Sequence, residues 1–410
     1  MTKFSFAFLF VIQSLLTFAN PDTWVQKTSL PAQPRAAAVG FTLNGYGYVG
    51  TGLDSTGTLL DDFWKYDPSN DSWSQVASFA GTARKNAVAF VTDTFAYVGT
   101  GTDNSGLTND FYRYDWQNNT WIQIENLDSA GSVYPRRDAT AFNIGNIGYV
   151  VGGYNGTSFY SNETWEYDGN RDTVWQEKTS FPLSGRRWAT AFSAGGFGFV
   201  GMGYNFSQEY FHDFWKYDTS SNTWTQIADF EGNKRAYGIG FVINGFAFVG
   251  TGFDGTFKDD FYMYDLANNQ WSAVASFGGQ PTSAAAGFSI NGKGYVFGGI
   301  DTAGYKNELW EYTPDNTTGI ENNAKDAILQ IITAPNPATT FIKFEDLQIS
   351  LNGNNKMKLF DTSGKLVLEK SLTINDKTVS VAGLTRGIYY YSISQQDKRT
   401  DSVTGKVILQ

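Results

Sequence analysis

The chain has 410 residues, of which 17% are aromatic and 17% charged, with 44 Gly, a single His, no Cys and a formal net charge of −10. This acidic balance disfavours binding to nucleic acids, because a negative surface repels phosphate backbones, and the absence of Cys excludes disulfides, thiol nucleophiles and thiolate metal sites. Strand-forming residues and turn glycines are plentiful and long Leu/Ala/Glu/Lys runs are absent, so the composition predicts an all-β fold.

The N-terminus has the pattern of a secretory signal peptide. Lys3 precedes an apolar run over residues 4–18, and the small residue Ala19 follows it. A positive start, a short apolar segment and a small residue at its end are typical of such a signal, and the run is short for a membrane span. We therefore predict a signal peptide over residues 1–19, with a buried N-terminal strand as the alternative. The sequence predicts no membrane span.

Six similar segments follow, each marked by a tryptophan. The tryptophans lie 47 to 54 residues apart, at positions 24, 73, 121, 175, 224 and 271. Each segment contains four predicted strands. The first is rich in small residues, follows an Arg in five copies and leads through a tight turn into the second, which ends in glycines. The third begins with an acid and an aromatic-x-Tyr-Asp pattern, and the fourth is opened by the Trp. Asn44-Gly45 is the clearest turn, because both residues of this hairpin type need positive φ. Four strands in about 50 residues predict a propeller blade.

These segments resemble the kelch repeat. The resemblance implies a six-bladed kelch β-propeller, which we assign to residues 20–314. Three copies depart from the family's glycine doublet by inserting Thr51, Thr100 or Thr251, and one inserts Met202. These insertions bring the local turn geometry into question, but not the fold.

The ends of the repeat array predict how the ring closes. The sixth copy ends at Tyr312 without a Trp strand, while the N-terminal Trp strand over residues 23–30 has no blade of its own. Pairing the two completes six four-stranded blades and removes an open sheet edge that would invite aggregation. We therefore expect the N-terminal strand to close the propeller.

The C-terminal part of the chain reads as a second domain. Residues 315–331 break the repeat and predict a linker, and the short alternating strands in residues 332–410 predict a small β-sandwich. Pro335-Asn336-Pro337, the sequences "LFDTSGKLV" and "GLTRGIYYYSI", and the final Lys406-Val-Ile resemble the type A C-terminal sorting domain of type IX secretion substrates. The resemblance implies export through the outer-membrane translocon to the cell surface or medium. The alternative is an ordinary sandwich module.

A pattern of glycines in the first repeat raises a further question. Residues 45–50 read G-x-G-x-x-G, the fingerprint of a dinucleotide-binding loop, and the pattern recurs only at residues 196–201. Such a loop follows a strand and opens a helix, and no helical pattern follows either copy. We therefore assign these glycines to blade turns and strands and predict no nucleotide cofactor.

Charged residues recur at one end of the predicted propeller. The first strands are preceded by an arginine in five copies, as Arg35, Arg84, Arg136, Arg186 and Arg235, whereas the sixth copy has Thr282. The third strands begin with an acid in every copy, as Asp62, Asp110, Glu163, Asp213, Asp260 and Glu308. A structural role would pair these charges within or between blades. A binding role would use the arginine forks to hold a carboxylate or another anion at the channel mouth.

Copies three and four break this repetition by adding functional groups. Our candidate ligand-binding residues are therefore Arg136, Arg137, Arg186, Arg187, Trp188 and Arg235. We assign no catalytic residue, metal site or cofactor, because His212 is the only imidazole and matches loop polar residues in the other copies.

The leading functional hypothesis is an exported kelch propeller that binds a protein or a glycan. The alternative is an enzyme such as a sugar-acid isomerase, since the kelch family includes a sialic-acid mutarotase that works with charged residues alone. A third hypothesis is a surface protein that binds copies of itself. A deep pocket in which Arg186, Arg187 and an unpaired acid converge would favour the enzyme, whereas pairing of every repeated arginine with a carboxylate or carbonyl would exclude it.

Overall fold

The computed structural model describes most of the propeller and the strands of the C-terminal part. The described residues are 22–127, 135–156, 160–171, 174–314, 332–334, 341–345, 355–361, 365–372, 378–395 and 402–409. The predicted signal peptide and the predicted linker lie outside them, so those two boundaries stay predictions. The chain divides into two compact units, Met1–Thr318 and Gly319–Gln410. Within the described residues every regular element is a strand, and none of them forms a helix that could cross a membrane.

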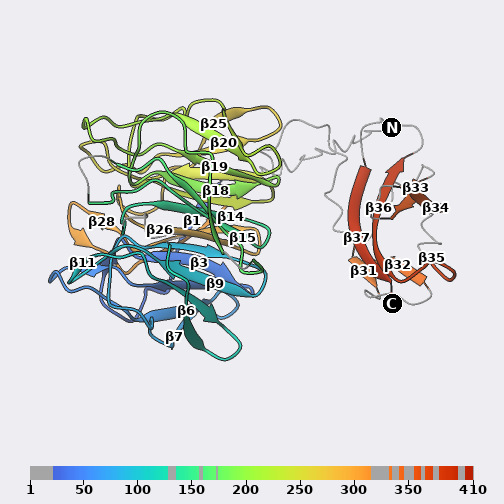
Figure 1. Cartoon of the computed structure of the whole chain (residues 1–410), viewed down its shortest axis with the longest axis horizontal. Helices are drawn as coiled ribbons and strands as arrows, with labels where there is room; N and C mark the ends of the chain where they lie inside the picture. Colours follow the sequence, from blue (N-terminus) through green and yellow to red (C-terminus); the bar gives the residue numbers. More distant parts are fainter. Residues whose placement is uncertain are drawn as a thin grey trace, which may run out of the picture. The chain divides into compact units, whose positions relative to one another are not determined.

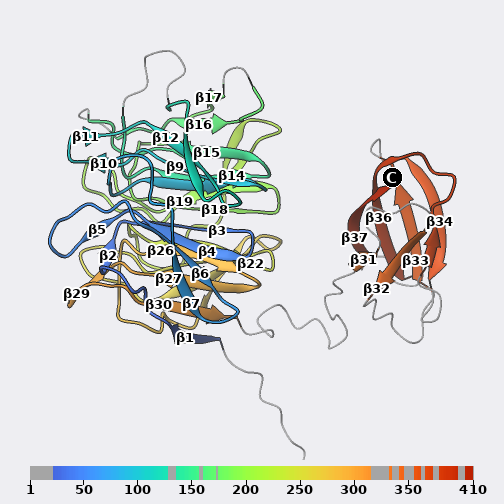
Figure 2. The same cartoon turned by 90° about the horizontal axis from the view of Figure 1, so that it is seen from below.

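Six four-stranded antiparallel sheets form the first unit, so the predicted six-bladed propeller is confirmed (Figures 1 and 2). Blades one to three consist of β3 (Val39–Leu43), β4 (Tyr46–Gly50), β6 (Phe63–Asp67) and β7 (Ser72–Val76); β8 (Val88–Val91), β9 (Phe95–Gly99), β12 (Phe111–Asp115) and β13 (Thr120–Ile124); and β14 (Thr140–Ile144), β15 (Ile147–Val151), β16 (Thr164–Tyr167) and β17 (Trp175–Lys178). Blades four to six consist of β18 (Thr190–Ala194), β19 (Phe197–Gly201), β20 (Phe214–Asp218) and β21 (Thr223–Gln226); β22 (Ile239–Ile243), β23 (Phe246–Gly250), β24 (Phe261–Asp265) and β25 (Gln270–Val274); and β26 (Ala286–Ile290), β27 (Lys293–Phe297), β30 (Leu309–Thr313) and β1 (Thr23–Lys27).

The N-terminal strand closes the ring, as predicted. β1 pairs antiparallel with β30, in a register that runs from Thr23 opposite Thr313 to Lys27 opposite Leu309. Trp24 lies against Phe261 and Phe277, with ring centroids 5.1 and 5.2 Å away. The first strand of the chain is therefore the outermost strand of the last blade, where it covers the edge of β30.

Adjacent blades are joined by a repeated hydrogen bond. The indole N–H of each fourth-strand Trp donates to a backbone carbonyl of the preceding blade, over 2.8 to 3.1 Å. These pairs are Trp24 with Ala275, Trp73 with Thr28, Trp121 with Ala77, Trp175 with Glu125, Trp224 with Thr179 and Trp271 with Ala228. The recurring Trp thus fills the space between blades and also sets the position of the next blade.

Small residues on the second strands have a steric cause. A Cβ atom on Gly198 would lie 2.1 Å from the Phe142 ring of the preceding blade. A side chain at this place would push the blades apart, so the glycine of the nucleotide-like pattern serves blade contact.

The inner strands begin four residues after the repeated arginines. The intervening chain contains a residue with positive φ, between 51° and 61°, in each blade: Ala37, Asn86, Asp138, Trp188, Tyr237 and Ala284. Their backbones join neighbouring blades around the axis. For example, the Trp188 N–H donates to the Asp138 carbonyl over 2.9 Å, and the Tyr237 N–H donates to the Trp188 carbonyl over 3.0 Å. We call these six residues the axial ring.

The Thr and Met insertions keep the geometry of the glycine doublet. Thr51, Thr100, Met202 and Thr251 have φ values of 56° to 60°, close to the 65° of Gly298 in blade six. A β-branched residue rarely adopts such a backbone. The surrounding contacts, described below, hold it there.

Two sheets form the second unit. The sheets are β31 (Ile332–Ala334), β32 (Phe341–Glu345) and β35 (Thr378–Ser380), and β33 (Asn355–Phe360), β34 (Leu366–Leu372), β36 (Gly387–Gln395) and β37 (Ser402–Leu409). Ile342 and Val379 from the first sheet share one buried cluster with Leu359 and Val407 from the second. The β-sandwich stays a prediction for this unit.

Candidate functional site

At one end of the propeller, the segments between the regular blade strands form short two-stranded ladders. β2 (Arg35–Ala36) pairs with β5 (Leu53–Asp54), β10 (Thr102–Asp103) with β11 (Gly106–Leu107), and β28 (Ile300–Asp301) with β29 (Gly304–Tyr305). β11 and β28 lie at the left of the propeller in Figure 1, and β5, β10 and β29 lie at the left in Figure 2. We call this end the mouth.

The five repeated arginines, here called the ring arginines, are buried at the mouth and paired with the acid of their own blade. These pairs are Arg35 with Asp62, Arg84 with Asp110, Arg136 with Glu163, Arg186 with Asp213 and Arg235 with Asp260. Arg84 shows the geometry, with Nη1 and Nη2 donating to the two Asp110 carboxylate oxygens over 2.6 and 2.8 Å.

Each ring arginine also holds the left-handed residue that follows its second strand. Nη1 of Arg84 donates to the carbonyl of Thr100 over 3.0 Å, and Nη1 of Arg186 donates to the carbonyl of Met202 over 3.0 Å. These bonds explain how a non-glycine residue is kept at positive φ. The acids respond to the same contacts: burial alone raises the pKa of Asp62, but hydrogen bonds and the charge of Arg35 hold this pKa below its ordinary value.

Three of the six candidate ligand residues belong to this set of buried pairs. Arg136, Arg186 and Arg235 are each at most 2% exposed, and each is bound to an acid and a carbonyl. This geometry favours the structural alternative for the three arginines, and it removes the support that the ring arginines gave to the enzyme hypothesis.

The other three candidates come together on blades three and four. Arg137 and Arg187 directly follow ring arginines in the chain. The backbone of each forms an antiparallel β-bridge with a tyrosine, Arg137 with Tyr154 and Arg187 with Tyr204. The guanidinium of Arg187 lies 3.6 Å from the centroid of the Trp188 ring, and that of Arg137 lies 5.4 Å from the centroid of Tyr154. Cation–π contacts of this kind hold the guanidinium planes against the aromatic rings.

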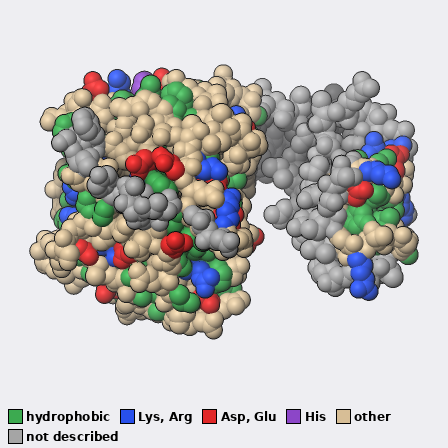
Figure 3. Space-filling view, viewed as in Figure 1, with side chains coloured by type: hydrophobic (Ala, Val, Ile, Leu, Met, Phe, Trp, Pro, Cys, Tyr) green, Lys and Arg blue, Asp and Glu red, His purple; other side chains and the backbone are tan. Residues whose placement is uncertain are grey.

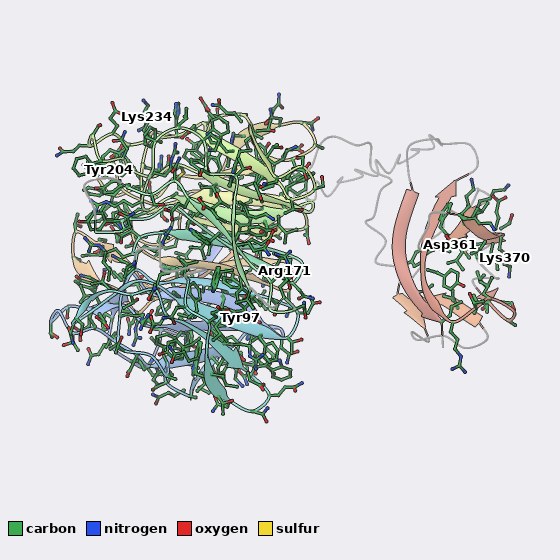
Figure 4. All side chains as sticks on the ribbon, in the orientation of Figure 1. Tyr97, Arg171, Tyr204, Lys234, Asp361 and Lys370 are labelled. Atoms are coloured by element: carbon green, nitrogen blue, oxygen red, sulfur yellow. The ribbon has the colours of Figure 1, made fainter. Side chains whose placement is uncertain are left out.

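A second tyrosine extends each of these two ladders. Tyr154 is bridged to Tyr160, and Tyr204 is bridged to Tyr210. We call the mouth residues of these two blades the arginine–tyrosine half: Arg137, Asp138, Tyr154, Tyr160, Arg187, Trp188, Tyr204 and Tyr210. Figure 4 places Tyr204 at the mouth end, whereas Arg171 and Tyr97 lie towards the other end of the propeller.

Asp138 lies at the centre of this half. Its side chain contacts Arg137 Nε at 3.5 Å and Arg187 Nη1 at 3.8 Å, and the residue is 3% exposed. Within the described parts of the chain, neither carboxylate oxygen has a hydrogen-bond partner, nor do Nε of Arg137, Nε of Arg187 or Nε1 of Trp188. Buried polar groups are normally hydrogen-bonded, so this cluster of unsatisfied groups at the mouth is the candidate functional site.

Burial raises the pKa of Asp138 above its ordinary value, although Arg137, the nearby Trp188 side chain, Arg187 and Lys85 oppose the rise. A raised pKa means that the ionised carboxylate destabilises the folded state at every pH above its unfolded value of about 4. This penalty grows as the pH rises above about 4, reaches its full size once the pH exceeds the folded pKa, and disappears again as the pH falls back to the unfolded value.

We therefore expect Asp138→Asn to raise the unfolding temperature near neutral pH, by an amount that shrinks to nothing near pH 4. Calorimetry over a pH series measures this difference. Asp61→Asn, at an exposed carboxyl, is the control and should change little. A lower unfolding temperature for Asp138→Asn at neutral pH would contradict the pKa direction. Besides the cations, the ionisable groups that face Asp138 are Tyr160 and Tyr237.

The axial ring encloses a small cavity beside this cluster. Its volume is about 150 Å³, and its lining includes Asn86, Asp138, Trp188 and Tyr237. The rings of Trp188 and Tyr237 stack with centroids 4.0 Å apart. The cluster of unsatisfied groups therefore borders the propeller axis.

Sequence reasoning missed Asp138 and the four tyrosines. Comparing single positions across the six copies would have found Tyr154 and Tyr204, because "YN" follows the glycines only in copies three and four, at residues 154–155 and 204–205. His212, the only imidazole, lies 3.8 Å from Asp229 and outside this cluster. No three His, Asp or Glu side chains of the described residues are placed to hold a metal ion. On the side drawn in Figure 3, charged side chains of both signs are scattered among uncharged ones.

Comparisons with known proteins agree with this architecture. The model of the KLHDC2/KLHL20/DRC7 Kelch-repeats domain matches residues 17–196, 82–237 and 132–290, and the model of the secretion system C-terminal sorting domain matches residues 334–410. A solved structure described as "Structure of YjhT" is similar with 18% identity and a TM-score of 0.57, over 71% of this chain and 98% of that chain. At this identity the likeness concerns the fold. A search of curated proteins found no match.

Proposed function

This chain belongs to the kelch-repeat family and is an exported protein, secreted or at the cell surface, with a C-terminal sorting domain, and we propose that its propeller binds a protein partner through the arginine–tyrosine half of the mouth. The sorting domain would deliver the propeller by contact with the type IX secretion machinery. The observation that carries the proposal is the group of buried polar atoms of Arg137, Asp138, Arg187 and Trp188 that make no hydrogen bond within the described residues, although Asp138 lies 3.5 and 3.8 Å from the two guanidinium groups.

The residue types support a protein partner over a glycan. Arg, Tyr and Trp are the side chains that most often dominate the binding energy of protein interfaces. Here Arg187 lies over Tyr160 as well as Trp188, with guanidinium-to-centroid distances of 4.8 and 3.6 Å. Phe206 lies 5.8 Å from Tyr160 and is 55% exposed, so it adds an apolar ring at the rim.

The experiment places a photo-crosslinking amino acid at position 206 and exposes intact cells carrying the protein to light. We expect a discrete crosslinked protein, whose yield falls about tenfold or more in an Arg187→Gln background, since a hydrogen bond to a charged group contributes roughly 1.5–3 kcal/mol. The same crosslinker at Ile122, a 46% exposed residue on an outer strand, is the matched control and should give none of this adduct.

Two results would overturn the proposal. Equal yields from positions 206 and 122 would mean that the mouth is not the binding surface. Binding to a glycan array that is lost in Arg187→Gln, together with no protein adduct, would replace the protein partner with a glycan.

A further inference from the structure

The other side of the mouth is built from different residues at the same repeat positions. In blades five, six and one, the residue after the ring position is small: Ala236, Ser283 and Ala36. The two ladder residues that follow are apolar or aromatic, as Phe253 and Phe257, Ile300 and Tyr305, and Leu53 and Leu59. Blades three and four fill this space with an arginine side chain, whereas blades five, six and one leave it open.

The open space is a pocket of about 300 Å³. Its lining includes Leu53, Lys85, Tyr237, Phe253, Phe257 and Tyr305. This volume lies at the lower end of the range for small-molecule sites, and an apolar wall with a few convergent polar groups is their usual composition. We call this space the apolar pocket.

Lys85 is the single charged side chain that lines the apolar pocket. The residue is half-buried, and no carboxylate of the described residues lies within ion-pair distance of its ammonium group. It occupies the same repeat position as Arg137 and Arg187, but those two arginines do not line this pocket. Lys85 therefore gives the pocket wall one positive charge.

We propose that the apolar pocket binds an organic anion whose aromatic or aliphatic body fills the space between Phe253, Phe257 and Tyr305 and whose carboxylate, sulfonate or phosphate pairs with Lys85. Charge complementarity selects this class: a cationic ligand would be repelled by Lys85, and a neutral apolar ligand would leave the ammonium group without a partner. The pocket is a second site, and Tyr237 separates it from the arginine–tyrosine half.

The test uses two fluorescent probes that share one ring system, anilinonaphthalenesulfonate and the uncharged phenylnaphthylamine. The full exported chain is titrated with each. We expect saturable binding of both, tighter for the sulfonate. Lys85→Met should weaken sulfonate binding about tenfold, because a charge-assisted contact is lost, and should leave phenylnaphthylamine unchanged. Phe257→Ala should weaken both probes.

Lys65→Met is the matched control, because Lys65 lies over the Tyr46 ring near the hairpin turns at the opposite ends of the strands. It should change neither probe. Sulfonate binding that is absent, or that is equal in Lys85→Met and the unaltered protein, would overturn the proposal. Tyr160→Ala separates the two sites: it should reduce crosslinking of the protein partner and leave both probes bound, so either proposal can fail alone.

Discussion

Replacing Arg84 by Met is expected to lower the free energy of unfolding by about 3–5 kcal/mol, the usual cost of removing one partner of a buried ion pair. Arg84 is fully buried, and besides its two bonds to Asp110 it donates to the carbonyls of Thr82 and Thr100. Met fills a similar volume but donates nothing, so Asp110 and two carbonyls lose their partner. Chemical denaturation followed by Trp fluorescence measures the change.

Arg113→Met in the same blade is the matched control. Arg113 lies over the Phe95 ring, 4.2 Å from its centroid, so its loss should cost only about 0.5–1 kcal/mol. The double replacement Arg84→Met with Asp110→Leu should recover part of the loss, because no buried charge is then left unpaired. Equal stabilities for Arg84→Met and Arg113→Met would contradict the structural role that we assign to the ring arginines.

Deleting residues 22–27 is expected to open the propeller and to destabilise it by more than the roughly 3–5 kcal/mol that truncation of a packed Trp alone costs. The deletion removes all of β1, including Trp24 and its indole bond to the Ala275 carbonyl, and it leaves the edge of β30 unpaired. An unpaired edge is a template for pairing with another chain. We therefore expect a lower unfolding temperature and concentration-dependent association, measured by calorimetry and light scattering.

A peptide of residues 22–31 should restore part of the unfolding temperature when added in excess, by refilling the edge. Deletion of residues 402–409 is the control, since it removes the edge strand β37 from the other unit. The unfolding temperature of the propeller should then be unchanged. A propeller without residues 22–27 that unfolds at the original temperature would show that closure by β1 adds no stability.

The main features of the fold could be predicted because their signals are local and repeated. Asn44-Gly45 predicts a hairpin turn, and Asn44 and Gly45 have φ values of 50° and 79°. The missing Trp strand after Tyr312 predicted the closure by Trp24, which the pairing of β1 with β30 confirms. Each of these inferences needs only a few neighbouring residues and the count of repeats.

The candidate site could be predicted only in part. Arg137, Arg187 and Trp188 were found because they break the repeat. Asp138 and Lys85 were missed, since nothing near them in the chain indicates that Asp138 is buried at the axial ring or that Lys85 lines an apolar pocket. Such properties depend on side chains from other blades.

The sequence by itself determined the all-β class, the six blades, the closing strand and the C-terminal sorting domain. Strand alternation, turn residues and repeat spacing act over short distances, so their consequences can be read along the chain. Only the tertiary structure decided which arginines at the mouth are buried in ion pairs and which stay partly exposed. Arg136 and Arg137 are adjacent in sequence, yet one is fully buried against Glu163 while the side chain of the other stays 30% exposed beside Asp138. The left-handed residue of the axial ring turns the chain between the ring arginine and the inner strand. Loops from other blades then determine which arginine is ion-paired and which is open to a ligand.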